Sequence, residues 1–413
     1  MNNDKNLKDP VILSAVRTPV GKFQGGLGSL PAPELGAIAI RAAVARAGLD
    51  PTTVYEVLMG HVLQAGAGQA AARVAALHGG LGDTVGAASV NKVCGSGLKA
   101  VMLAANAILA GEAEVYVAGG MESMSLTPYL LPTARTGLRF GHAEVKDAIL
   151  HDGLWCAFQN WAMGNAAEFI ARQFELTRQE LDEYALASHD KAAAATVAGH
   201  FQAEITPVEI RGRKGAATVV ERDEPIRATF QNGSYTLDTN LAALGKLPPA
   251  FEPDGVVTAG NAPGLNDGAA ALVVTSRAAA ERQGLTPLAR IVGYTHAAVA
   301  PEWLFAAPAR AIPRLLAKVG WSLDEVDLLE VNEAFASQVL ANGAELMQKG
   351  YPWRWDKVNV NGGAIALGHP IGASGARVLV TLVHALRRRG LRRGVASLCL
   401  GGGEAVALAV EVE

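Results

Sequence analysis

The sequence predicts an α/β protein made of two similar βαβ-type halves with an insertion between them. One segment before residue 120 and another after residue 360 share the order strand, glycine-rich turn, apolar helix, glycine, strand. The two helices, at 98–109 and 376–389, are apolar on most faces, which is typical of helices buried in an α/β core. The residues from about 125 to 250 break this rhythm, and we expect them to form a separate unit.

The first repeat carries a cysteine on its turn. In Ser89-Val-Asn-Lys-Val-Cys-Gly-Ser-Gly97, a β-like run ends at Val93, and the glycines at 95 and 97 permit a sharp turn into the helix. Cys94 would therefore lie at a helix N-terminus, where free N–H groups and the helix dipole favour a thiolate. By itself, a cysteine beside glycine is more often a small inert core residue.

The second repeat carries a histidine and another cysteine in similar settings. His369 lies in a glycine-rich turn before the helix at 376–389, and Cys399 ends the β-like run 395–398. A lone histidine on a turn is usually only a solvated or hydrogen-bonded side chain. Because α/β sheets collect their ligands at the carboxyl ends of their strands, however, we expect Cys94, His369 and Cys399 to converge there.

Composition narrows the classes of function. With 413 residues, half of them apolar and 18% charged, the chain is long enough for two or three domains with a large interior. A net charge of −3 gives no indication of nucleic acid or an anionic membrane as a partner. No apolar run is expected to span a bilayer, and the residues around Lys8 contain no secretory signal. Three cysteines make no disulfide framework, so we expect a cytoplasmic protein.

The insertion contains polar turns at 133–142, an amphipathic helix at 166–174 and a charged hairpin at 209–224. A second helix is predicted after Thr177, because Thr177 and Glu180 form a capping-box pattern. The arginine-rich run 387–393 is better explained as a solvated helix end than as an anion site.

Taken together, the motifs resemble those of the thiolase family. Besides the three reactive segments, the chain contains Val11–Phe23, Gly119-Gly-Met-Glu-Ser-Met-Ser125, Val257–Ala270 and Val331-Asn-Glu-Ala-Phe-Ala336 in the order expected of that family. The resemblance covers nearly the whole chain. It implies the thiolase fold, in which the two halves stack as a layered α-β-α-β-α core with an inserted loop domain.

The resemblance also implies a division of the chain. Residues 1–124 together with about 250–281 would form the N-terminal half, and about 282–413 the C-terminal half. Residues from about 125 to 249 would form the loop domain that covers the site and binds coenzyme A.

The same resemblance implies a reaction, the reversible Claisen condensation of two acetyl-CoA to acetoacetyl-CoA and CoA. Cys94 would carry the acyl group, and His369 would activate it as a base. Cys399 would move the α-proton, and Asn332 would order a water facing the enolate oxygen. The backbone N–H groups of Cys94 and Gly401 would stabilise the tetrahedral oxyanion. No metal or cofactor is expected beyond the coenzyme A thioesters that serve as substrates.

The resemblance to thiolases also implies substrate contacts at individual positions of this chain. Arg227 would lie near the adenine nucleotide, and the pantetheine and acyl channel would be lined by Leu154, Met163, Ala259 and Phe335. Each of these also suits an ordinary surface or core position. Three departures from acetyl-specific thiolases remove polar groups near the carrier arm, at Ala162, Ala243 and Pro263.

Three alternative functions share part of this pattern. A decarboxylating ketoacyl synthase of the same fold has no use for Cys399 as a second catalytic cysteine. A degradative 3-ketoacyl-CoA thiolase with broader chain length is the alternative within the family, and a scaffold subunit of an acyl-CoA channelling complex is a weaker one. We expect a homotetramer, a dimer of dimers, with the segment 126–139 as the tetramer contact.

Overall fold

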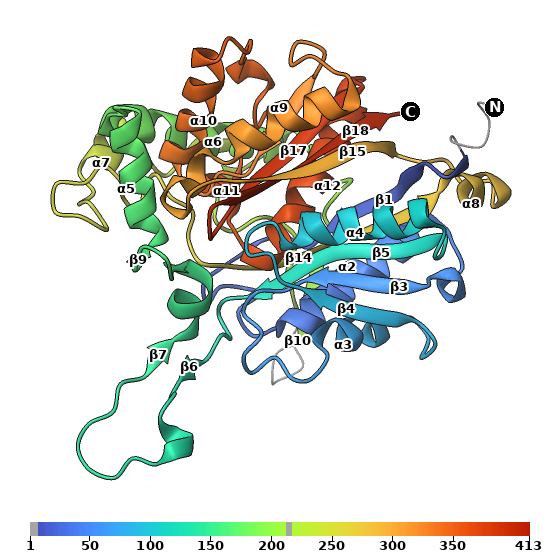
Figure 1. Ribbon diagram of the computed structural model, residues 1–413, viewed down its shortest axis with the longest axis horizontal. Helices are drawn as coiled ribbons and strands as arrows, with labels where there is room; N and C mark the ends of the chain where they lie inside the picture. Colours follow the sequence, from blue (N-terminus) through green and yellow to red (C-terminus); the bar gives the residue numbers. More distant parts are fainter. Residues whose placement is uncertain (1–6, 212–216) are drawn as a thin grey trace.

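The computed structural model describes residues 7–211 and 217–413. Ten of the strands in these residues form one hydrogen-bonded sheet with the order β16-β17-β18-β15-β1-β14-β5-β3-β4, and β2 pairs with β14 (Figure 1). They are β1 (Pro10–Arg17), β2 (Gly21–Lys22), β3 (Glu56–Gly60), β4 (Gly86–Val90), β5 (Val115–Ser123), β14 (Asn266–Ser276), β15 (Ala289–Ala298), β16 (Leu328–Val331), β17 (Arg393–Leu400) and β18 (Glu404–Val412).

The sheet consists of two units with the same strand order, as the sequence repeat predicts. In the first unit the order is β1-β14-β5-β3-β4, and in the second it is β15-β18-β17-β16. A fifth position matches as well: Val358 forms a parallel bridge with Leu329 of β16, in the place that β4 takes beside β3. Within the sheet, the two units are connected by a short antiparallel pairing of β1 with β15, at Val11 and Ile12. The predicted pair of sheets is therefore continuous along one seam.

Helices cover and separate the two units, and this arrangement confirms the predicted fold class. Helices α2 (Ala32–Ala47) and α3 (Ala71–His78) pack on the outer face of the first unit. The outer face of the second unit is covered by α9 (Pro308–Val319) and α10 (Ala336–Gln348). Between the units lie α4 (Ser96–Ala110) and α12 (Ile371–Arg389), whose apolar residues share one core with strands of both.

Two glycines let α4 and α12 approach backbone to backbone. A Cβ placed on Gly97 would lie 2.7 Å from the amide nitrogen of Ala376, and one on Gly375 would lie 2.4 Å from that of Leu98. Any side chain at these two positions would push the helices apart. Because both helices begin at the reactive turns, this contact brings the Cys94 turn close to the His369 turn.

Several boundaries differ from the sequence prediction. Strand β4 ends at Val90, and Val93 belongs to the turn with φ of 47°. Helix α12 begins at Ile371 directly after Pro370, five residues earlier than predicted, since proline is favoured at a helix start. Cys399 lies within β17 rather than after it.

The insertion forms helices beside the second unit and an arm that projects away from the body (Figure 1). Helix α6 (Arg178–Val197) has the predicted capping box of Thr177 and Glu180, and α5 (Met163–Gln173) matches the predicted amphipathic helix closely. The short pair β6 (Tyr129–Leu130) and β7 (Lys146–Asp147) forms the base of the arm. Other elements here are β8 (Trp155–Cys156), β9 (Trp161–Ala162), β12 (Ala228–Gln231), β13 (Ser234–Leu237) and α7 (Leu241–Gly245).

The predicted charged hairpin is present as β10 (Val208–Arg211) paired with β11 (Ala217–Val220), and its turn at 212–216 lies outside the described residues. The two remaining helices are α8 (Arg277–Arg282) and α11 (Ala364–Leu367). Arginines 387–389 form the last turn of α12, which ends at Gly390 as expected, whereas Arg393 begins β17 and pairs with Glu325. We retain the three-part division of the chain as a proposal.

The expectation that no apolar run could span a bilayer was wrong on length and composition. The window Val93–Ala110 has a mean hydropathy of 1.6 over 18 residues. Its hydrophobicity has a structural cause, because α4 is packed between the two units against α12 and β5. A core helix of this kind meets the same criterion as a membrane span.

Candidate functional site

A mostly apolar cavity of about 310 Å³ lies where the two units and the insertion meet. Cys94, His369 and Cys399 all line it. They come from the turn before α4, the turn before α12 and the end of β17. The predicted convergence of the three reactive side chains is therefore observed in the structure.

Cys94 lies on a strained turn. Val93, directly before it, has φ of 47°, which is unfavourable for a β-branched residue and is typical of backbone held in place for function. Backbone N–H groups of Gly401 and of Cys94 itself act on the sulfur and favour its charged form. The two predicted oxyanion donors therefore belong to the immediate surroundings of the Cys94 sulfur.

The pKa of the Cys94 thiol runs against the expected thiolate. Desolvation raises the pKa of the Cys94 thiol to about 11, and the charge of Glu122 adds to this, whereas the two backbone N–H groups act in the opposite direction. The loss of water on burial is the largest of these effects. The resting group is a neutral thiol that needs a base.

His369 is suited to be that base. Its Nδ1 lies 2.6 Å from Oγ of Ser374, and this hydroxyl donates to the carbonyl of Pro370 at 2.9 Å. Since the single hydroxyl proton is used there, Nδ1 carries the imidazole proton and Nε2 has the free lone pair. Burial lowers the pKa of His369 to about 4, so that the ring is neutral at physiological pH.

Cys399 is buried at the end of β17. Burial raises the pKa of its thiol well above the ordinary value, and the neighbouring Cys94 raises it further. Both thiols line the same cavity, within reach of one substrate.

Asn332 follows β16 and is fully buried, but it is not among the residues that line the cavity. Its backbone N–H donates to the carbonyl of Ser397 at 3.0 Å. Within the described residues neither side-chain amide atom has a hydrogen-bond partner. A buried, unsatisfied amide is costly and suits a residue that binds a water or a substrate group.

The predicted apolar lining is also found at the cavity. Leu154, Met163, Ala259 and Phe335 all line it. An edge-to-face contact joins Phe335 to Phe251 at 6.3 Å between ring centroids. Ala162 and Pro263 belong to the wall as well, so two of the three departures noted in the sequence adjoin the substrate space.

Arg227 does not line the cavity. Its guanidinium donates to the carbonyl of Ala259 at 2.5 Å, and its backbone N–H donates to Nδ1 of His189 at 3.2 Å. Arg227 therefore braces one wall from behind, while part of its side chain stays accessible to solvent. Of the predicted substrate contacts, Arg227 is the one that does not line the cavity, although it contacts Ala259, which does.

Sequence reasoning missed several residues that hold the site. Asn266 accepts a hydrogen bond from the His369 N–H at 2.8 Å, and Ser374 orients the ring. Both belong to family motifs, at 257–270 and 359–375, but serine and asparagine are common in turns for other reasons. Only the fold reveals that they contact His369.

Glu333, next to Asn332, was missed as well. Its carboxylate accepts hydrogen bonds from the hydroxyl groups of Tyr184 (3.0 Å) and Ser188 (2.7 Å), both on α6. It also accepts from the side-chain amide of Asn359 (2.9 Å) and the N–H of Ile365 (3.1 Å). This carboxylate ties the insertion to the unit that carries His369.

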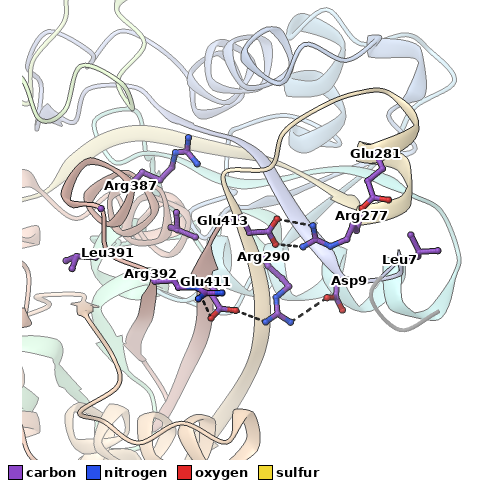
Figure 2. A pocket seen from close by; sticks show the side chains of 12 residues that line it. Leu7, Asp9, Arg277, Glu281, Arg290, Arg387, Leu391, Arg392, Glu411 and Glu413 are labelled. Atoms are coloured by element: carbon purple, nitrogen blue, oxygen red, sulfur yellow. Dashed lines mark hydrogen bonds and ion pairs between the residues drawn. The ribbon is translucent and has the colours of Figure 1, made fainter. Parts of the chain in front are cut away.

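A larger surface hollow, of about 1100 Å³, lies where β1, β15 and β18 meet (Figure 2). Its charges pair with one another. Arg290 bridges Asp9 at 3.5 Å and Glu411 at 2.7 Å, and Arg277 pairs with Glu413. These ion pairs join the two units at their seam, and none of the reactive residues lies in the hollow.

Two family models match the chain in sequence. The thiolase N-terminal domain matches residues 10–278, and the thiolase C-terminal domain matches residues 285–412. Together they cover nearly all of the chain.

Curated relatives and solved structures agree with these models. The chain is 53% identical to an acetyl-CoA acetyltransferase of Pseudomonas aeruginosa, covering 97% of this chain and 99% of that protein. An acetyl-CoA acetyltransferase of Escherichia coli is 52% identical, with coverage of 98% and 99%. The crystal structure of the Bacillus anthracis acetyl-CoA acetyltransferase superimposes with a TM-score of 0.93 at 45% identity, covering 98% of this chain and 99% of that one.

Proposed function

This chain belongs to the thiolase family, and we propose that it is an acetyl-CoA C-acetyltransferase, which condenses two acetyl-CoA to acetoacetyl-CoA and CoA or runs the reverse thiolysis. The observation that carries the proposal is the convergence of Cys94, His369 and Cys399, from both halves of the chain, on one apolar cavity. The names of relatives about half identical over nearly the whole chain support the acetyl substrate.

In the first half-reaction, Nε2 of His369 takes the proton of the Cys94 thiol. The thiolate attacks the thioester carbonyl of acetyl-CoA, and the N–H groups of Cys94 and Gly401 stabilise the oxyanion. The carbon–sulfur bond to coenzyme A breaks. The CoA thiolate leaves with the proton held by His369, and the acetyl group remains on Cys94 as a thioester.

In the second half-reaction, Cys399 first passes its thiol proton to Nε2 of His369 and then, as a thiolate, takes a proton from the methyl group of a second acetyl-CoA. The enolate oxygen faces Nε2 of His369 and a water that Asn332 orders; the unsatisfied amide of Asn332 supports this role. The methyl carbon attacks the acetyl carbonyl on Cys94, the Cys94 sulfur departs with the proton held by His369, and Cys399 keeps the methyl proton. Acetoacetyl-CoA is released, and both thiols return to their neutral state.

Leu154, Met163, Ala259 and Phe335 would contact the pantetheine arm and the acyl group. We propose that Arg227 acts near the nucleotide through its accessible side chain. With Ala162 and Pro263 in the wall, the arm meets few polar partners there. A degradative thiolase of broader chain length remains the second candidate, because this apolar wall would also accept a longer acyl chain.

We further propose a cytoplasmic homotetramer. All three cysteines are free, which suits a reducing compartment. Strand β4 is an edge strand without charged residues, and such an edge favours pairing with a second copy. On the arm, Tyr129 is 67% exposed and Leu138 is 55% exposed, which supports a further contact there. A monomer in light scattering at micromolar concentration would contradict the assembly.

The test of the proposed function is steady-state thiolysis of 3-ketoacyl-CoA substrates graded by chain length. We expect acetoacetyl-CoA to give the highest kcat/KM. If the longest substrate were preferred, the acetyltransferase assignment would give way to the degradative one.

A further inference from the structure

Glu122 lies at the end of β5 and is fully buried, and it contacts both halves of the chain. Its carboxylate accepts hydrogen bonds from the backbone N–H groups of Val62 (3.2 Å) and Leu63 (3.1 Å), which follow β3. It also accepts from the N–H of Gly372 at 2.8 Å, in the first turn of α12. A carboxylate at a helix N-terminus is favoured by the helix dipole.

The turn that carries His369 is thus held at two points by the first unit. Gly372, three residues after His369, is bound by Glu122, and the N–H of His369 itself is bound by Asn266 at 2.8 Å. Cys94 also belongs to the first unit. These two side chains therefore fix His369, a residue of the second unit, relative to Cys94.

The packing around Gly372 leaves little freedom for this turn. A Cβ on Gly372 would lie 2.9 Å from Oε2 of Glu122 and 2.8 Å from the carbonyl oxygen of Met121. Only glycine lets the N–H approach the carboxylate this closely. Glu122 does not line the cavity, so it does not contact the substrate directly.

We propose that Glu122, in its carboxylate form, is a positioning residue that clamps the His369 turn across the two halves of the fold. This inference rests on the proposed function, in which His369 serves Cys94 as the base. A base displaced by about 1 Å from its partner can lose roughly a hundredfold in rate.

The charged state of Glu122 is set by its neighbours on every side. Nε2 of His61, after β3, lies 3.4 Å from Oε1, while Cys94 and Asp267 also interact with its charge. Desolvation raises the pKa of Glu122 to about 7, although the three backbone N–H groups act against this. Burial lowers the pKa of His61 to about 4, so His61 stays neutral. Below about pH 7 the carboxyl gains a proton and loses acceptor capacity, and the clamp weakens.

The variant that tests the clamp is Glu122→Gln, assayed by thiolysis of acetoacetyl-CoA from pH 6 to 8. We expect kcat to fall about tenfold with KM nearly unchanged. The wild type should show a rise in kcat with pH, with a midpoint near 7, that is absent in Glu122→Gln. A rise in KM as large as the loss of kcat would overturn the positioning role.

The matched control is Glu204→Gln, which removes a buried carboxylate that pairs with Arg17 and contacts Thr381 farther along α12. It should lower Tm but keep the wild-type pH profile. A second variant, Asn266→Ala, removes the other anchor; it should lower kcat similarly and retain the inflection near pH 7, since Glu122 is intact.

These variants remain informative if Glu122→Gln does not fold. A wild-type kcat that is flat from pH 6 to 8, or an Asn266→Ala variant with unchanged kcat, would overturn the clamp. Acetylation of Cys94 in the wild type is measured alongside by intact-mass spectrometry. If Cys94 is not acetylated, the proposed function itself is refuted. If Cys94 is acetylated and Glu122→Gln leaves kcat unchanged, only the clamp is refuted.

Discussion

Oγ of Ser374 lies 2.6 Å from Nδ1 of His369 and donates its own hydrogen bond to the Pro370 carbonyl. This relationship fixes the tautomer of His369 with Nε2 as the proton acceptor. Ser374→Ala should leave the fold intact and lower kcat about 10- to 100-fold, because the ring loses its orientation. Steady-state thiolysis of acetoacetyl-CoA measures this, with Ser374→Thr expected to retain more activity than Ser374→Ala. Equal activity in all three proteins would contradict it.

The raised thiol pKa of Cys94, about 11, makes a prediction for the free enzyme. The rate of Cys94 alkylation by iodoacetamide should rise with pH above neutrality, because the reactive thiolate appears only as the thiol titrates. Peptide mapping separates this site from Cys156 and Cys399. A rate that is already maximal at pH 6 would instead indicate a thiolate–imidazolium pair at rest.

A covalent thioester on Cys94 is expected from the ping-pong mechanism. Intact-mass spectrometry after mixing with acetoacetyl-CoA should show one acetyl group per chain, and none in Cys94→Ala. Cys156→Ala is the matched control, since Cys156 is buried outside the cavity lining. If Cys94→Ala carried the same adduct, another residue would be the acyl carrier.

The two cavity thiols should separate by function. Cys399→Ala should still be acetylated by acetyl-CoA, because that step needs only Cys94 and His369, but condensation should fail. Exchange of the acetyl-CoA methyl protons in heavy water should drop in this variant. Full exchange together with loss of the adduct would mean that the two roles are reversed.

The helix contact at Gly375 should be essential for stability. Gly375→Ala places a Cβ 2.4 Å from the amide nitrogen of Leu98, and backbone on both sides cannot move without cost. We expect roughly 1–3 kcal/mol of destabilisation, measured by denaturant unfolding. Gly82→Ala is the control, since its Cβ would come no closer than 3.8 Å to Thr84. Equal stability of the two variants would show that α4 and α12 can separate freely.

The sequence was sufficient to predict the repeat and the meeting of Cys94, His369 and Cys399. Glycines beside strand ends are local signals, and a shared strand order brings equivalent turns together. The left-handed Val93 could not be predicted, because a β-branched residue disfavours that conformation locally and only the surrounding fold imposes it.

The protonation states were beyond the sequence for a different reason. A helix N-terminus predicts a lower thiol pKa for Cys94, but the direction is decided by desolvation in a cavity that residues from the insertion help to line. Likewise, Glu122 and Asn266 are ordinary polar residues in the sequence. Their contact with the His369 turn depends on pairings between distant parts of the chain.

Glu333 fixes helix α6 of the insertion against the second unit. Its four hydrogen bonds join α6 of the insertion to Asn359 and Ile365 in the second unit. If α6 moved outward, the buried Glu333 carboxylate would lose its two hydroxyl donors, at a cost of several kcal/mol. The α6 part of the insertion is therefore fixed to the second unit rather than hinged, and acyl-CoA enters a cavity that is already formed.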